Sequence, residues 1–123
     1  MKILIVEDDS FLARVYRAQF AKRGAESVIL ESGEHVLETA KKEMPDVIVL
    51  DIMLPPPKNG FDVLRELKAD AITKKIPVVM LSMLSSDSDI VLSNDLGATR
   101  HIVKSNIKFS EAADYIVSVS QKN

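Results

Sequence analysis

The stretch Asp46-Val-Ile-Val-Leu-Asp51 decides how this chain folds. Its apolar run is rich in β-branched residues and lies between prolines, at position 45 and at 55–57, which is typical of a strand buried on both faces within a parallel sheet. Burying an unpaired carboxylate is costly, so Asp51 should lie at the carboxyl end of the strand and face a cation or solvent. Open α/β sheets place their chemistry at that edge.

The composition indicates one compact domain, residues 1–123, with 46% hydrophobic residues to form its core. The 16 basic residues are scattered among 18 acidic ones, and the net charge of -2 favours neither nucleic acid nor an anionic membrane as a partner. The chain has no cysteine, and its two histidines, His35 and His101, are far apart, which argues against disulfides, zinc sites and serine-type triads.

No apolar stretch reaches the roughly 20 residues that a membrane span needs. The sequence starts Met1-Lys2 and enters a strand pattern directly, without the features of a signal peptide. We therefore expect a cytoplasmic protein. Asn123 follows directly on the last expected helix, so we expect any output to come from a partner.

Apolar runs alternate with helical patterns five times along the chain. Strands are expected at residues 3–6, 26–30, 46–51, 77–81 and 101–103. Helices should begin at Asp9 or Ser10, at Ser32 or Gly33, shortly before Phe61, near Ser86 and at Ser110. The fourth helix should turn Ile90, Val91, Leu92 and Leu96 inward, although its 93–95 segment is poor in helix formers and makes it a candidate for motion. This alternation predicts a doubly wound α/β fold, with five parallel strands and helices on both faces.

Four of these strands end at chemically distinctive side chains. The first, third, fourth and fifth strands are followed by Glu7-Asp8, Asp51, Ser82 and Lys104, in that order. The carboxyl ends of these strands lie together at one edge of a doubly wound sheet. Three carboxylates brought together need a cation, and a site of oxygen ligands alone favours Mg²⁺. Mg²⁺ usually binds a phosphate oxygen as well, so Asp51 is a candidate nucleophile that forms an aspartyl phosphate, with Lys104 and Ser82 on the phosphoryl oxygens.

These residues, together with Asp51-Ile-Met-Leu-Pro55, resemble the receiver domain of two-component response regulators over essentially the whole chain. The resemblance implies a flavodoxin-like (βα)5 fold with strand order 2-1-3-4-5. It implies that Asp51 accepts a phosphoryl group from a sensor histidine kinase or phosphotransfer protein. Asp8, Asp51 and the Met53 carbonyl would bind Mg²⁺ directly, and Glu7 would bind it through water.

The resemblance also implies a switch. Phosphorylation adds about -1.5 to -2 charges, and drawing Ser82 and Lys104 inward would remodel the surface of the fourth helix, fifth strand and fifth helix for an unknown downstream protein. The same surface could form a homodimer. Such a domain is not an enzyme beyond catalysing its own phosphorylation and dephosphorylation. His101 stands where the family usually has a rotating Tyr or Phe, and a strand-edge histidine without a switching role is the alternative.

Two positions that tune dephosphorylation in the family are Met53 and Leu84 here, and both are apolar. We therefore expect slow loss of the phosphoryl group, because neither side chain would orient the attacking water. The loop from Asp51 to Gly60 also looks one residue longer than usual and is stiffened by its prolines.

Two departures keep a second interpretation open. Met83 stands where a small residue is usual and could crowd a phosphodonor, and Ser105 replaces a proline usually joined by a cis bond. A non-proline cis bond costs about 2.5–4 kcal/mol, so we expect a trans bond and a different placement of Lys104. The alternative is thus a pseudo-receiver that acts as a phosphorylation-independent scaffold.

An enzyme or flavin carrier on the same fold is disfavoured. A haloacid-dehalogenase-type phosphatase needs an Asp at position 53, and a phosphate loop after the first strand conflicts with Glu7-Asp8-Asp9. The sequence leaves open whether the chain is a single-domain regulator or a receiver cut from a longer protein.

Overall fold

The computed structural model describes residues 1–120 as five strands alternating with five helices. In chain order the elements are β1 (Lys2–Val6), α1 (Ser10–Ala21), β2 (Glu26–Leu30), α2 (Val36–Glu43), β3 (Val47–Leu50), α3 (Gly60–Ala69), β4 (Val78–Ser82), α4 (Asp87–Asp95), β5 (Arg100–Val103), the 3-10 turn η1 (Lys104–Asn106) and α5 (Phe109–Ser120). All strands are parallel and their order is β2-β1-β3-β4-β5. The predicted fold and strand order are confirmed. Asn123 lies outside the described residues.

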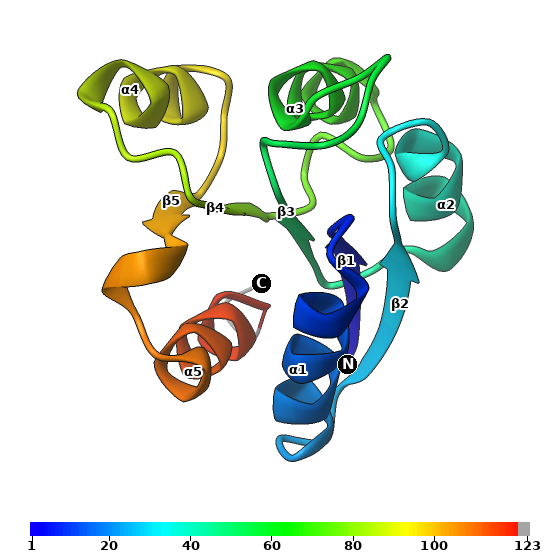
Figure 1. The fold of residues 1–123 in the computed structure, drawn as a ribbon. Coiled ribbons are helices and arrows are strands. Elements are labelled where there is room, and N and C mark those ends of the chain that lie inside the picture. Colours follow the sequence, from blue (N-terminus) through cyan, green and yellow to red (C-terminus); the bar gives the residue numbers. More distant parts are fainter. Residues whose placement is uncertain (121–123) are drawn as a thin grey trace.

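The sheet separates two apolar cores (Figure 1). α1 and α5 cover one face, and α2, α3 and α4 lie on the other. Alternate residues of one strand enter different cores: Val47 and Val49 pack under α1 and α5, whereas Ile48 and Leu50 pack under α2 and α3. A strand with both faces covered must be apolar throughout, and all four residues of β3 are buried.

The start of α1 agrees with the sequence, but those of α2 and α5 do not. Asp9 caps α1, because its Oδ1 accepts the Leu12 N–H at 3.1 Å. α2 begins only at Val36, since the segment around Gly33 packs against α3 and a Cβ on Gly33 would lie 2.8 Å from Val63 Cγ2. The expected start at Ser32 or Gly33 is therefore wrong.

The last helix also begins at a different residue from the one expected. α5 starts at Phe109, so the predicted cap Ser110 lies inside its first turn. The Phe109 ring meets Tyr16 of α1 edge to face, with 5.3 Å between ring centroids. This contact draws the residue before Ser110 into the helix, at an energetic gain typical of aromatic pairs.

α4 is covered far less than the sequence suggests. Ser93 is its one buried residue, whereas Val91 is 55% exposed and Ile90 and Leu92 are partly buried. The predicted inward face is thus wrong for Val91 and only partly right for the others. The cause is position, because α4 lies over β5, the edge strand, where little sheet surface remains to be covered.

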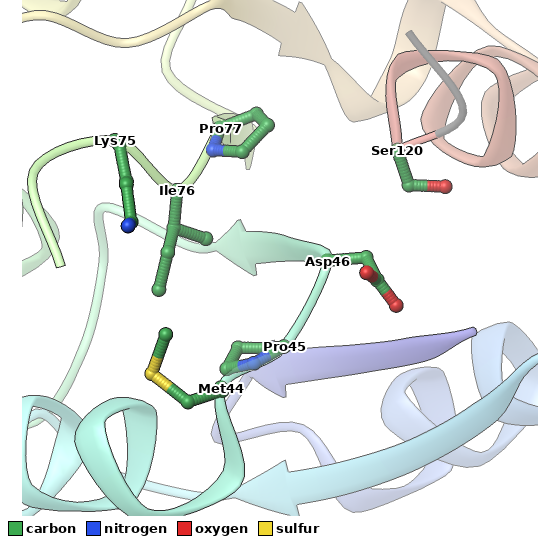
Figure 2. A pocket seen from close by; sticks show the side chains of 7 residues that line it. All are labelled: Met44, Pro45, Asp46, Lys75, Ile76, Pro77 and Ser120. Atoms are coloured by element: carbon green, nitrogen blue, oxygen red, sulfur yellow. The ribbon is translucent and has the colours of Figure 1, made fainter. Parts of the chain in front are cut away.

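An open cavity of about 380 Å³ lies at the amino ends of β3 and β4, opposite the carboxyl ends that the acidic residues follow (Figure 2). It is lined by Met44, Pro45, Asp46, Lys75, Ile76, Pro77 and Ser120. Its distance from the carboxyl ends of the strands separates it from the expected chemistry.

Within residues 1–120, no helix has the length and apolar character to cross a membrane.

Candidate functional site

The sheet itself holds two of the acidic residues in place. The Glu7 N–H donates to the Leu30 carbonyl at 2.9 Å, and the Asp51 N–H donates to the Val6 carbonyl at 3.0 Å, so the ladder of β1 continues one residue past each strand end. Both side chains are nearly buried, with 6% and 5% of each residue exposed, whereas Asp8 is exposed. Of the two partners expected for Asp51, a cation or solvent, its burial leaves the cation.

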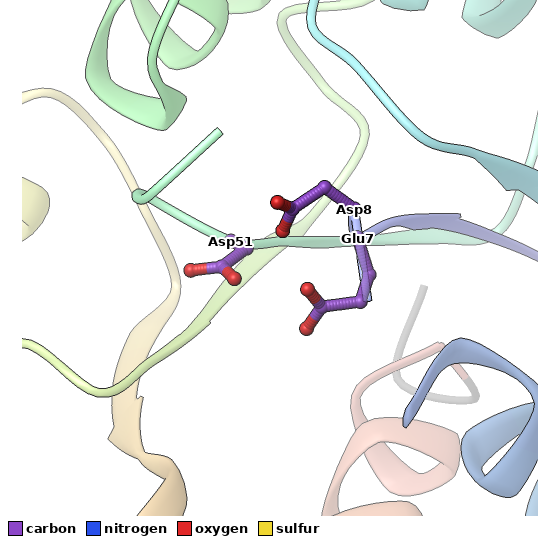
Figure 3. A group of neighbouring side chains, drawn as sticks. All are labelled: Glu7, Asp8 and Asp51. Atoms are coloured by element: carbon purple, nitrogen blue, oxygen red, sulfur yellow. The ribbon is translucent and has the colours of Figure 1, made fainter. Parts of the chain in front are cut away.

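The three carboxylates gather at the carboxyl edge where β1 and β3 are neighbours (Figure 3). One oxygen from each of Glu7, Asp8 and Asp51 lies within 4.8 Å of the others. This edge is also where the strand order reverses, between β1 and β3, which is where open α/β sheets bind ligands.

Lys104 reaches into this cluster from the end of β5. Its Nζ donates to Glu7 Oε1 at 2.5 Å and to Asp51 Oδ2 at 2.9 Å. Burial is the main cause that raises the pKa of Glu7 to about 7, while the hydrogen bond from Lys104 opposes the rise and the Asp51 charge adds to it. Burial lowers the pKa of Lys104, but its two carboxylate partners outweigh this and leave that pKa above the ordinary value.

The bond from Lys104 to Ser105 is trans, as expected, because the only cis peptide in residues 1–120 joins Pro56 to Pro57. Lys104 begins the short turn η1 and still contacts both carboxylates. The replacement of a proline by Ser105 therefore does not carry the lysine away from the acidic cluster.

Gly60 is a site residue that the sequence reasoning did not single out. A Cβ at this position would lie 2.2 Å from the Asp51 carbonyl oxygen and 2.5 Å from the Ile52 Cα. Its N–H donates to the Ile52 carbonyl at 2.8 Å, so the start of α3 is packed directly against the backbone that carries Asp51. Only glycine allows this approach, and its place shortly after a buried strand and at a helix start was the available signal.

Ser82 and the residues after it flank the cluster on the side of β4. Ser82 is fully buried, and its Oγ accepts the Leu84 N–H at 3.4 Å. Met83 is 55% exposed and therefore projects outward. Met53 is equally exposed, and its N–H donates to Asp51 Oδ1 at 3.1 Å.

An open and largely apolar hollow of about 490 Å³ borders the cluster at Asp8. It is lined by Asp8, Ile52, Met53, Leu54, Pro55, Asn59, Phe61 and Leu84. The two positions expected to tune dephosphorylation, Met53 and Leu84, thus share one hollow with the acidic residue Asp8.

His101 lies inward rather than on the surface. It is 9% exposed, its Nδ1 is 2.9 Å from Ser93 Oγ, and its Nε2 is 2.8 Å from the Leu84 carbonyl oxygen. Of the two interpretations of His101, the strand-edge histidine without a switching role assumed partial exposure, and that placement is wrong. His35 is surface-exposed at the start of α2.

The residues present fit a hard divalent cation. Carboxylate oxygens are the ligands that Mg²⁺ prefers, and three acids against one lysine leave the cluster with excess negative charge. Asp8 is exposed, so a metal there can keep water ligands, as Mg²⁺ usually does. The cluster offers no nitrogen or sulfur ligand that would favour zinc.

Comparison with known sequences agrees with this geometry. Residues 3–114 match the family model of the response regulator receiver domain. The chain is 35% identical over 103 residues to the DNA-binding response regulator MtrA of Mycolicibacterium paratuberculosis, and 33% identical over 103 residues to the probable transcriptional regulator ycf27 of Guillardia theta. These matches cover 84% of the chain but only 44% and 39% of the two relatives, so the chain spans less than half their length.

Solved structures give the same result. The BeF3-activated receiver domain of Klebsiella pneumoniae RstA is 31% identical, with a TM-score of 0.85 over 97% of this chain and 98% of that one. The phosphorylated cyanobacterial phytochrome response regulator RcpA is 31% identical, with a TM-score of 0.78 over 98% and 91%. Such domains are signalling switches rather than conventional enzymes. This chain belongs to the response regulator receiver domain family.

Proposed function

We propose that the chain is a phosphorylation switch in which Asp51 accepts a phosphoryl group with Mg²⁺ as cofactor. The observation that carries the proposal is the buried Asp51 carboxylate, which gathers with two further acids and accepts a hydrogen bond from the Lys104 ammonium. One of those acids, Asp8, lines an open hollow beside the cluster. A sensor histidine kinase or phosphotransfer protein is the proposed donor, and the cytoplasm is the proposed compartment.

Each side chain of the site has its own role in the proposed phosphoryl transfer. An Asp51 carboxylate oxygen attacks the phosphorus of a phosphohistidine, the bond from phosphorus to the imidazole nitrogen breaks, and the imidazole takes up a proton. Glu7, Asp8, Asp51 and the Met53 carbonyl would hold Mg²⁺, which neutralises phosphoryl charge when bound. Lys104 already lies 2.9 Å from Asp51 and would turn its Nζ to a phosphoryl oxygen, while Ser82 would donate to another.

The proposed output is a changed surface made of α4, β5 and α5. Moving Ser82 and Lys104 toward the phosphoryl group pulls on the β4–α4 loop and on η1, which flank that surface. A downstream protein, or a second copy of this chain, is the proposed partner there.

The two departures that suggested a phosphorylation-independent scaffold do not disturb the site. Met83 projects outward, and Lys104 keeps both carboxylate contacts despite the trans bond to Ser105. The scaffold interpretation therefore has no support in the geometry.

The test is intact-mass measurement after incubation with acetyl phosphate and Mg²⁺. We expect the wild type to gain one phosphoryl mass and Asp51→Asn to gain none. Asp46→Asn is the matched control, because Asp46 lies just before the other end of the same strand and should leave phosphoryl uptake intact. An unmodified wild type that is folded and binds Mg²⁺, or equal uptake by Asp51→Asn, contradicts the proposal.

We also expect slow dephosphorylation. Met53 and Leu84 present apolar groups to the hollow that borders the site, and neither side chain can orient an attacking water. The decay of the phosphorylated mass after removal of acetyl phosphate measures the lifetime. Met53→Asn should shorten it by offering a polar side chain, and a wild-type lifetime of only seconds rules the idea out.

A further inference from the structure

Ser93 is the one residue of α4 that is buried among the described residues, and it is polar. A buried hydroxyl is costly unless it is hydrogen-bonded, and the Ser93 Oγ lies 2.9 Å from His101 Nδ1. The contact joins α4 to β5 by a polar link where apolar packing is sparse. It suggests that Ser93 has a role beyond filling space.

The partner atoms of the two ring nitrogens indicate which tautomer of the neutral His101 ring fits the contacts. The Leu84 carbonyl can only accept a hydrogen bond, so His101 Nε2 carries the proton and donates to it at 2.8 Å. In the neutral ring Nδ1 then accepts, so the Ser93 hydroxyl donates to it. The imidazole is held at both ends, by α4 on one side and by the β4–α4 loop on the other.

Leu84 connects this pair to the phosphorylation site. Its carbonyl accepts from His101, and its N–H donates to Ser82 Oγ at 3.4 Å. The two backbone groups of one loop residue thus tie Ser82, the proposed phosphoryl ligand at the end of β4, to His101 on β5. Ser93 is the last residue of this series of hydrogen bonds, at the end away from Ser82.

We propose that Ser93 is a positioning residue of the phosphorylation site, which acts through His101 and Leu84 to hold Ser82 where it can bind a phosphoryl oxygen. This inference rests on the proposed function. Because these hydrogen bonds already order the loop, phosphoryl binding costs less conformational entropy. Removing the Ser93 hydroxyl should therefore weaken that binding. By linkage, occupancy of the phosphoryl site strengthens the contact between Ser93 and His101 to the same degree.

The test is calorimetric titration of the folded chain with beryllofluoride, a phosphoryl mimic, in the presence of Mg²⁺. Loss of one hydrogen bond predicts binding about fivefold weaker in Ser93→Ala. Asn94→Ala, an exposed neighbour on the same helix, should bind like the wild type. Binding by Ser93→Ala that equals or exceeds that of the wild type overturns the inference alone, whereas a wild type that binds no beryllofluoride overturns the proposed function as well.

A double-mutant cycle separates positioning from a merely structural role. His101→Phe removes both ring hydrogen bonds, so adding Ser93→Ala to it should not weaken binding further. Additive losses show that Ser93 does not act through His101 and contradict the inference. Nitrogen-15 NMR of the imidazole gives an independent signature, since the wild type should show a protonated Nε2 and an accepting Nδ1, and Ser93→Ala should lose the Nδ1 hydrogen bond.

Discussion

The helices that follow β3 and β4 are embedded to very different degrees. α3 buries five of its ten residues, whereas α4 buries one of its nine. α3 also begins with a complete capping box between Asn59 and Asp62, and its first residue, Gly60, presses on the Asp51 backbone. The acids therefore lie against a well-packed helix, and we call Asp51 and α3 the rigid side. The helix after Ser82, α4, has few buried residues and can move more readily, and we call it the responsive side. A switch needs both parts, because a change at a fixed site must be passed to an element that can move.

The largest effect should come from disturbing the rigid side at Gly60. Gly60→Ala places a Cβ against backbone atoms that cannot yield, and we expect it to lower the free energy of unfolding by about 4 kcal/mol and to suppress phosphoryl uptake. Chemical denaturation and intact mass measure the two effects.

Gly24→Ala is the control for this change, because Gly24 has a φ of +78° but no atom near the added Cβ. It should cost only about 1 kcal/mol of conformational strain and leave phosphoryl uptake intact. Similar losses in the two variants contradict the argument from close approach.

Matched truncations in the two helices test the difference in embedding directly. Leu67 of α3 is fully buried, so Leu67→Ala should lower the free energy of unfolding by about 3 kcal/mol. Val91 of α4 is 55% exposed, so Val91→Ala should cost less than about 0.5 kcal/mol.

Hydrogen exchange of the wild type gives the corresponding dynamic measurement. We expect the amides of α4 to exchange faster than those of α3, since elements with few buried apolar contacts open at low free energy. Equal protection of the two helices, or a large cost of Val91→Ala, removes the distinction between a rigid and a responsive side.

The sequence was informative where local pattern and position in the sheet agree. A strand buried on both faces must be apolar, so the polar residue that ends each run, such as Asp51 or Lys104, marks the sheet edge without knowledge of the neighbours. Helix starts and inward faces depend instead on contacts between distant segments. Gly33 against α3 and Phe109 against Tyr16 displace two helix starts, and neither contact has a local signal.

The site shows the same limit. The residue types of Glu7, Asp8 and Asp51 predicted an acidic cluster, but the inward placement of His101 depends on Ser93, eight residues away on another element. A serine in a helix is ordinarily taken as a poor helix former. Only the tertiary structure turns it into a hydrogen-bond partner.

The charge on Glu7 leads to a prediction about pH, which tests the electrostatics of the rigid side. The pKa of Glu7, raised by burial to about 7, means that the metal-free protein retains a proton there under mildly acidic conditions. Mg²⁺ binding requires the ionised cluster and releases this proton, so its affinity should fall by about tenfold for each pH unit below 7.

The sign for stability follows from the same shift. The folded pKa of Glu7 lies above its ordinary value of 4.5, so the metal-free protein should lose stability as the pH rises from about 4.5 to about 7, while Mg²⁺ offsets that loss. Calorimetric Mg²⁺ titrations at about pH 6 and about pH 8 measure the effect, and Glu7→Gln should bind with an affinity that changes little between them. A wild-type affinity that is equally flat would mean that Lys104 keeps Glu7 ionised throughout, so that the lysine, and not the metal, is the main counter-charge of the resting site.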